Sequence, residues 1–250
     1  MEFKAAICPN CGGDLRVPED KKVLKCMYCG KDVIVEEAIR KAEPSLEGYL
    51  ALARTAKDSK NYKEAYVYYN KVLEVNPMNY ESWLGKAVCI GWQSTIDDFK
   101  VQEVITNFES AIKYSPVEVR ASVINETNIV LVALFSFINT WIYNNGIFIG
   151  NWEIFCKRCQ LLVSAWEILN QYEPSNKQVI DNIIDVCRRQ IEGVKYNPAP
   201  GQHAIFRGHV KITDQYKHNL SQKMDQYIAK RKALDPNYIP PSFKKKSIFM

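Results

Sequence analysis

Residues 45–77 read SLEGYLALARTAKDSKNYKEAYVYYNKVLEVNP, and the helical pattern of the chain is clearest in this stretch. Ser45 is a typical N-cap residue, and apolar residues at helical spacing follow it, which predicts a helix from Leu46 to about Lys57. A second helix is expected from Asn61 to about Val75, because Asn-Pro follows and cannot continue a helix. The stretch therefore predicts two helices joined by a short turn.

The same order of signals returns at Tyr80, which lies 34 residues after Leu46. One helix is expected from Tyr80 to Trp92, and after a gap another helix ends at Tyr114, before Ser-Pro. Over residues 45–116 the chain resembles tetratricopeptide repeats, whose period is about 34 residues. The residues on signature positions are Tyr49, Ala53, Ala65, Tyr69 and Pro77 in the first repeat, and Trp83, Ala87, Phe108, Ala111 and Pro116 in the second.

The second repeat departs from the family pattern in two ways. It has about five extra residues around Gln93–Phe99, and Lys86 stands where an apolar residue is usual. An unrelated bundle of helical hairpins is therefore the alternative. Beyond residue 116 the pattern is degenerate, and long helices are expected over residues 117–143, 152–172 and 176–194.

Two C-x-x-C pairs stand near the N-terminus, Cys8 with Cys11 and Cys26 with Cys29, separated by 14 residues. Zinc favours four thiolates in a tetrahedron, and a glycine after each pair suits the positive φ of such a turn. With short strands expected at residues 15–17, 22–25 and 32–35, residues 5–36 resemble a zinc ribbon. The resemblance implies one structural Zn²⁺, because four cysteines leave no position for water. A redox dithiol is the alternative.

The predicted fold class is mainly α, with a small N-terminal β zinc ribbon followed by an α-helical, tetratricopeptide-like repeat array. We expect the ribbon at residues 1–36, a linker helix at 37–44, the helical domain at 45–196, and a basic C-terminal helix with a Pro- and Lys-containing tail at 197–250. Asn197–Gly201 is rich in proline and glycine and marks the last boundary.

The net charge of +5 is concentrated at the C-terminus, where residues 203–250 hold ten Lys or Arg and three Asp. Residues 1–40 hold seven basic and seven acidic residues, so the ribbon lacks the surplus of cations that binds phosphates. Nucleic acid could therefore bind only through the basic tail. That tail either docks on the helical body or binds an acidic surface.

Residues 129–149 are mostly apolar and approach the length of a membrane span. Asn144-Asn145-Gly146 is a turn signal that shortens the helix, so we expect a buried helix. Membrane insertion is the alternative. Cys156 and Cys159 lie within a helical pattern and are expected in the core.

No secretory signal is visible, and the eight cysteines then fit a reducing cytoplasm.

These features predict a non-catalytic, zinc-binding adaptor that binds another protein through its helical repeats. The alternative is a nucleic-acid-associated protein that uses the ribbon and the basic tail. An enzyme ranks third, because no P-loop, dinucleotide fingerprint or nucleophile elbow is present and no small-molecule substrate is indicated. The resemblance implies that a partner lies along the first helix of each repeat, and the residues expected to contact it are Leu50, Arg54, Lys57, Leu84, Val88 and Trp92.

Overall fold

The computed structural model describes residues 3–18, 21–42, 44–146, 149–195, 209–210 and 212–242. The elements in chain order are β1 (Phe3–Ile7), β2 (Asp14–Pro18), β3 (Val23–Lys25), β4 (Asp32–Ile34), α1 (Val35–Ala42), α2 (Leu46–Asp58), α3 (Tyr62–Val75), α4 (Tyr80–Trp92), α5 (Val101–Tyr114), the short turn η1 (Val117–Val119), α6 (Arg120–Asn145), α7 (Ile149–Tyr172), α8 (Lys177–Glu192), β5 (Val194–Lys195), β6 (His209–Val210) and α9 (Asp214–Leu234).

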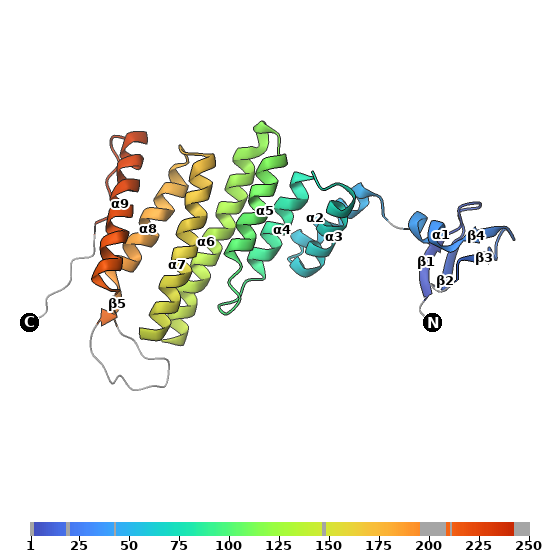
Figure 1. Ribbon diagram of the computed structural model, residues 1–250, viewed down its shortest axis with the longest axis horizontal. Coiled ribbons are helices and arrows are strands. Elements are labelled where there is room, and N and C mark those ends of the chain that lie inside the picture. Colours follow the sequence, from blue (N-terminus) through green and yellow to red (C-terminus); the bar gives the residue numbers. More distant parts are fainter. Residues whose placement is uncertain are drawn as a thin grey trace, which may run out of the picture.

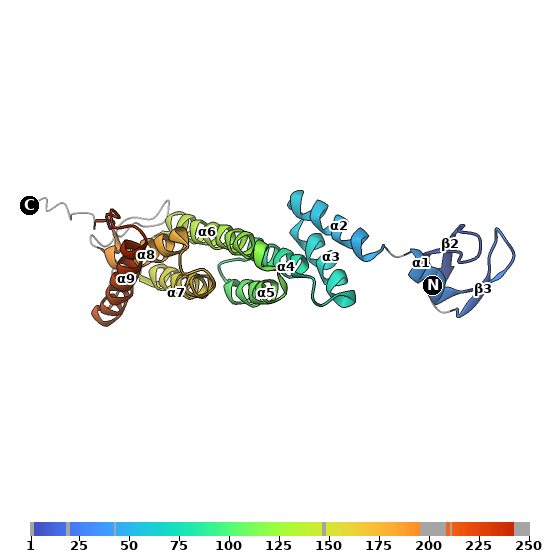
Figure 2. The same ribbon diagram turned by 90° about the horizontal axis from the view of Figure 1, so that it is seen from above.

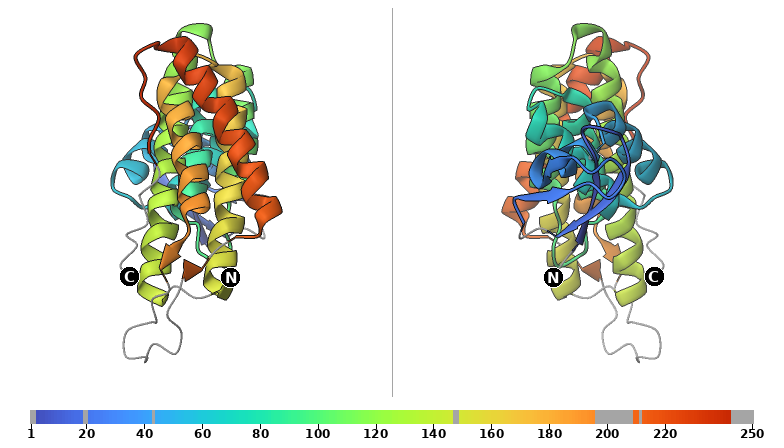
Figure 3. Two further views of the ribbon diagram at one scale, coloured as in Figure 1. Left: turned by 90° about the vertical axis from the view of Figure 1, so that its left-hand side faces the viewer. Right: turned by 90° about the vertical axis from the view of Figure 1, so that its right-hand side faces the viewer.

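Helices α2 to α9 form a row of antiparallel hairpins, with the ribbon beyond α2 (Figure 1). Each helix packs on the next in sequence, and α4 with α6 and α5 with α7 join neighbouring hairpins. Seen from above, α4 and α6 lie along one side of the row, and α5 and α7 lie along the other side (Figure 2). At the other end α9 lies in front of α8 (Figure 3, left), and the two helices are in extensive contact. The predicted fold class is confirmed.

Side-chain caps explain where several helices begin. Each cap residue accepts a hydrogen bond from a backbone N–H one turn into the helix, which satisfies a donor that has no partner within the helix. The capped helices are α2 (Ser45 from Gly48, 3.1 Å), α4 (Asn79 from Ser82, 2.8 Å), α8 (Asn176 from Val179, 3.1 Å) and α9 (Thr213 from Tyr216, 3.3 Å).

The extra residues of the second repeat form an ordered loop. The turn between α4 and α5 spans eight residues, 93–100, against three residues, 59–61, between α2 and α3. Arg158 of α7 holds this loop: its Nη2 donates to the Ile96 carbonyl at 2.7 Å, and its guanidinium lies 5.4 Å from the centre of the buried Phe99 ring. The insertion therefore connects the second hairpin to the third.

Lys86 occupies its usually apolar position without a buried charge. Its ammonium lies 5.3 Å from the ring centre of Tyr66 and 5.0 Å from that of Trp83. Ammonium groups are attracted to the faces of aromatic rings, and the aliphatic part of lysine packs as a hydrocarbon. The departure from the family pattern is therefore compatible with stacking of α3 on α4.

The ribbon consists of two antiparallel hairpins, β1–β2 and β3–β4, and has a core of its own. The expected linker helix is α1, and its Val35 and Ala38 lie in that core against β1. Strand β1 was not expected from the sequence, because Phe-Lys-Ala-Ala-Ile has alanines that seldom favour strands. Pairing with β2 overrides that local preference.

Helix α6 ends at Asn145, where Gly146 has a φ of +86°, as the Asn-Asn-Gly turn predicts. Within the described residues, the segment Val117–Asn145 is long and apolar enough to cross a membrane by length and composition, and 44% of its most apolar window is buried. Its buried side packs on the neighbouring helices, with Leu131, Ile138 and Ile142 fully covered.

Two glycines of α4 allow close approach of its neighbours. A Cβ at Gly85 would lie 2.2 Å from Cζ of Tyr69 on α3, and a Cβ at Gly91 would lie 2.2 Å from Cγ1 of Val130 on α6. Both distances are far below van der Waals contact. Helix α4 therefore packs on both sides only because these positions have no side chain.

Gly91→Ala should destabilise the chain, because overpacking costs about 1–3 kcal/mol and outweighs the gain in helix propensity of about 1 kcal/mol. Val130→Ala removes the methyl that the new Cβ would meet. The double variant should therefore lose less folding free energy than the two single variants lose together. Chemical denaturation of the four proteins measures this coupling. Additive changes would show that α4 and α6 do not meet at these residues.

Candidate functional site

The four cysteines of the ribbon form one cluster. All four Sγ atoms lie within 4.8 Å of one another, with Cys8 and Cys29 at 3.8 Å and Cys11 and Cys26 at 3.7 Å. A tetrahedron with Zn–S bonds of about 2.3 Å has S–S edges of about 3.8 Å. The sulfur positions therefore fit one tetrahedral metal ion.

The two C-x-x-C turns have the same backbone geometry. The N–H of Gly12 donates to the Cys8 carbonyl and that of Gly30 to the Cys26 carbonyl, both at 2.9 Å. Gly12 and Gly30 have φ values of +75° and +73°, which residues with a side chain rarely adopt. Each turn thus directs two sulfurs to the same point, as the sequence predicted.

The thiols perturb one another strongly. Burial opposes ionisation of Cys8, but hydrogen bonds from the backbone at Cys11 and Asn10 lower the pKa of Cys8 to about 6. At Cys11 the Gly13 backbone favours the thiolate, yet burial and the three other sulfurs raise its pKa to about 12. Thiolates at this spacing repel one another, and a bound cation would offset that repulsion.

The four remaining cysteines lie in the helical core. Burial is the main cause that raises the pKa of Cys89, Cys156 and Cys187 to about 12, and it raises that of Cys159 as well. Buried thiols of high pKa are poor nucleophiles and poor metal ligands. The C-x-x-C at 156–159 is therefore part of the core of α7, as expected.

Three of the residues expected to contact a partner are buried. Leu50, Leu84 and Val88 have 4%, 8% and 5% of their surface exposed and pack within the helical body. The sequence could not separate them from exposed residues, because a first helix of a repeat is apolar both toward its own hairpin and toward the groove. Leu50 and Val88 pack inside the body, and Leu84 also lines a small hollow between α2, α3, α4 and α6.

Arg54 and Lys57 form ion pairs that bridge the helices. The guanidinium of Arg54 binds both carboxylate oxygens of Glu81 on α4, at 2.6 and 2.7 Å, and reaches Glu47 at 3.2 Å. The ammonium of Lys57 lies 2.9 Å from Oε1 of Glu126 on α6. Each of these cations therefore already has a carboxylate partner within the chain.

Trp92 is the apolar residue of the predicted contact set that is exposed. It is 48% exposed at the end of α4, and its ring is stacked on Tyr62, with centroids 5.7 Å apart and planes 7° apart. A Trp held in this way offers a large apolar surface and loses little freedom when a partner binds.

Two apolar residues of α6 extend this surface, Ile129 (63% exposed) and Phe137 (39% exposed). Helical spacing places Trp92 on the side of α4 that holds Glu81 and Gly85, and Ile129 on the side of α6 that holds Ser122 and Glu126. The contact between Gly91 and Val130 then brings Trp92 and Ile129 close together. We call this surface the α4–α6 face; its residues are Glu81, Gly85, Trp92, Ser122, Glu126, Ile129 and Phe137.

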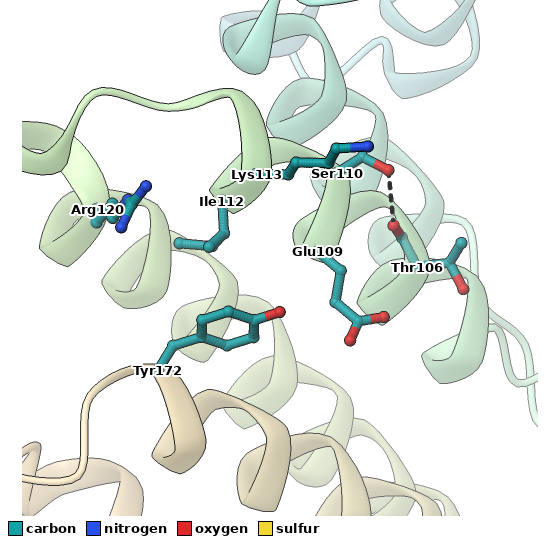
Figure 4. Close-up of a pocket in the computed structure, with 7 residues that line it drawn as sticks. All are labelled: Thr106, Glu109, Ser110, Ile112, Lys113, Arg120 and Tyr172. Atoms are coloured by element: carbon teal, nitrogen blue, oxygen red, sulfur yellow. Dashed lines mark hydrogen bonds between the residues drawn. The ribbon is translucent and has the colours of Figure 1, made fainter.

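A hollow lies on the other side of the row, between α5 and the end of α7 (Figure 4). Ile112 and Tyr172 provide its apolar surface, and Glu109 points down beside Tyr172. Lys113 and Arg120 extend in different directions in this view. The charged groups do not converge on one point, so this hollow offers no acid–base pair to a substrate.

No family model matches the chain, and no curated protein matches it significantly. Similar solved structures include YrrB, described as a TPR protein with an unusual peptide-binding site, with 13% identity and a TM-score of 0.31 over 81% of this chain and 93% of YrrB. The MamA protein has 11% identity and a TM-score of 0.28 over 76% of this chain and 92% of MamA. The repeat architecture of this chain is seen in its own hairpins, whose first helices begin 34 residues apart, at Leu46 and Tyr80.

Leu50→Asp with Leu84→Asp should unfold the first two hairpins, because each change buries a carboxylate and costs more than about 4 kcal/mol. Trp92→Asp should cost only about 1 kcal/mol, the value of a lost aromatic contact. Thermal melts followed by circular dichroism compare the variants. A double Leu variant that melts like the parent would contradict the burial of these residues.

Proposed function

We propose that the chain is a non-catalytic adaptor that binds a segment of another protein on the α4–α6 face. The observation that carries this proposal is the half-exposed Trp92, fixed on Tyr62 beside the exposed Ile129. Aromatic residues at the centre of an apolar patch dominate the energy of many protein interfaces. The ion pairs of Arg54 and Lys57 border the patch with polar groups, as at a typical interface.

The partner segment is expected to be amphipathic. Its apolar side chains would cover Trp92, Ile129 and Phe137, and its polar side would face solvent, since exposed apolar groups gain most from burial.

The alternative, nucleic acid binding, would use the ribbon and the basic C-terminal tail. In α9 of that tail, Lys223 is paired with Glu167 and Arg231 with Asp181. Lys244, Lys245 and Lys246 lie outside the described residues.

The metal of the ribbon is proposed to be one structural Zn²⁺. Four cysteine sulfurs at tetrahedral spacing are the usual zinc donor set and leave no position for a substrate. The ribbon core is small, so metal binding would supply much of its folding energy. Metal-binding thiolates remain reduced in the cytoplasm, so we propose that the protein is cytoplasmic. We also propose that the chain is divided into the ribbon, the helical body and the basic tail.

The purified chain should contain one zinc per molecule, and Cys26→Ser should lose it, because three ligands bind zinc far more weakly than four. The helical circular dichroism signal should persist, since α2 to α9 have a separate core. Elemental analysis and circular dichroism measure both. Cys156→Ala is the matched control and should retain the metal; a chain without zinc under reducing conditions would contradict the assignment.

Trp92→Ala should weaken partner binding about tenfold or more, the usual effect at an interfacial hot spot. The test is affinity capture from nuclease-treated lysate with the full chain as bait, quantified by mass spectrometry. Tyr172→Ala is the matched control, because Tyr172 is an aromatic residue of similar exposure (47%) at the hollow of Figure 4. Equal recovery of every partner by the parent and Trp92→Ala would refute the proposed face.

A further inference from the structure

A small hollow lies on the α4–α6 face, on the side of Gly85 away from Trp92. Its volume is about 250 Å³, room for one long side chain. Four helices and the turn before α6 contribute to it, and the lining residues are Lys57, Tyr69, Tyr80, Glu81, Leu84, Gly85, Val119, Ser122, Val123 and Glu126.

The Tyr69 hydroxyl is an unpaired polar group at this hollow. Tyr69 is 1% exposed, and its ring passes the Cα of Gly85 so closely that a Cβ there would lie 2.2 Å from Cζ. Among the residues that the structure describes, the hydroxyl has no hydrogen-bond partner. Tyr69 lines the hollow, so this oxygen can pair with a group that enters it.

Glu126 offers this hollow one carboxylate oxygen that can accept a hydrogen bond from a cation. Its lining holds two carboxylates, Glu81 and Glu126, and one cation, Lys57. Arg54 binds both oxygens of Glu81, whereas Lys57 binds only Oε1 of Glu126. In the described part of the chain, Oε2 of Glu126 and the Ser122 hydroxyl have no hydrogen-bond partner, and both can accept one.

The Tyr69 hydroxyl stays protonated in this setting. Burial is the largest cause that raises its pKa, and the charges of Glu81 and Glu126 raise it further. A neutral phenol can accept a hydrogen bond from an N–H group.

We propose that this hollow binds an arginine or lysine side chain of the partner segment. This inference rests on the proposed function and names the chemistry that the partner must carry. The N–H groups of the guest donate to the Tyr69 hydroxyl, the Ser122 hydroxyl and Oε2 of Glu126. The basic residue is thereby a second determinant of binding, separate from the apolar contact at Trp92.

The geometry also fixes the spacing within the partner. Gly85 and Trp92 are seven residues apart on α4, which corresponds to about 10 Å along the helix axis. An extended segment covers that distance in about three residues and a helical segment in about seven. The basic residue and the apolar anchor of the partner are therefore separated by one of these two intervals.

The test selects peptides that bind the full chain from a random phage-displayed library. The affinity of synthetic copies for the chain is then measured by calorimetric titration. Selected peptides should carry Arg or Lys at one of the two intervals from an apolar residue. Tyr69→Phe and Glu126→Gln should each weaken binding about tenfold, the effect of losing a hydrogen bond to a charged group. The matched controls Tyr68→Phe and Glu74→Gln, at residues outside the hollow, should bind like the parent.

Replacement of the basic residue by citrulline changes only the peptide, so it tests the charge even where a protein variant folds poorly. It should weaken binding by a similar factor. Peptides that require Trp92 but tolerate citrulline, or that carry an acidic residue at this position, would overturn the inference and leave the proposed function standing. Peptides that all bind independently of Trp92 would refute the proposed function and the inference together.

Discussion

No hairpin of this chain can bury its apolar side alone, and stacking on the next hairpin is the constraint on which the structure depends. Helix α4 contacts α2, α3, α5 and α6, so most of its surface faces neighbouring helices. Positions 85 and 91 of α4 are glycines because Tyr69 and Val130 pack directly against the α4 backbone there, and a Cβ would collide with them. What remains uncovered is the single side of α4 and α6 that carries Trp92 and Ile129. The row thus creates the candidate interface as the surface that stacking leaves open.

Local signals in the sequence define the helices well. The bounds of α4, Tyr80–Trp92, follow from the cap at Asn79 and the periodic apolar residues, and the end of α6 follows from Asn-Asn-Gly. The cysteine cluster is equally local, because two short turns and their glycines contain all four ligands. These features depend on contacts between residues close in sequence, which a pattern can represent.

The exposed surface depends on contacts between residues far apart in sequence, and here the sequence was less informative. Leu50, Leu84 and Val88 were expected to contact a partner, and in the structure most of each side chain is buried. Ile129 and Phe137 were not singled out, because α6 is apolar on nearly every side and its periodicity marks no exposed face. Their exposure follows from the places where α4 and α7 happen to cover α6. Lys86 shows the opposite case: its departure from the pattern is compensated by two aromatic rings that only the packed structure brings together.

The loop at residues 93–100 affects which helices must separate together when the row of hairpins unfolds locally. In a simple repeat array each unit contacts only its neighbours, so hairpins can detach one at a time. Arg158 instead ties the loop of the second hairpin to α7 of the third, through the Ile96 carbonyl and the Phe99 ring. Detaching α4 and α5 from the row breaks these contacts at the same moment as the contacts of α4 with α6. We therefore expect the backbone amides of α4 to α7 to exchange hydrogen through a common opening reaction.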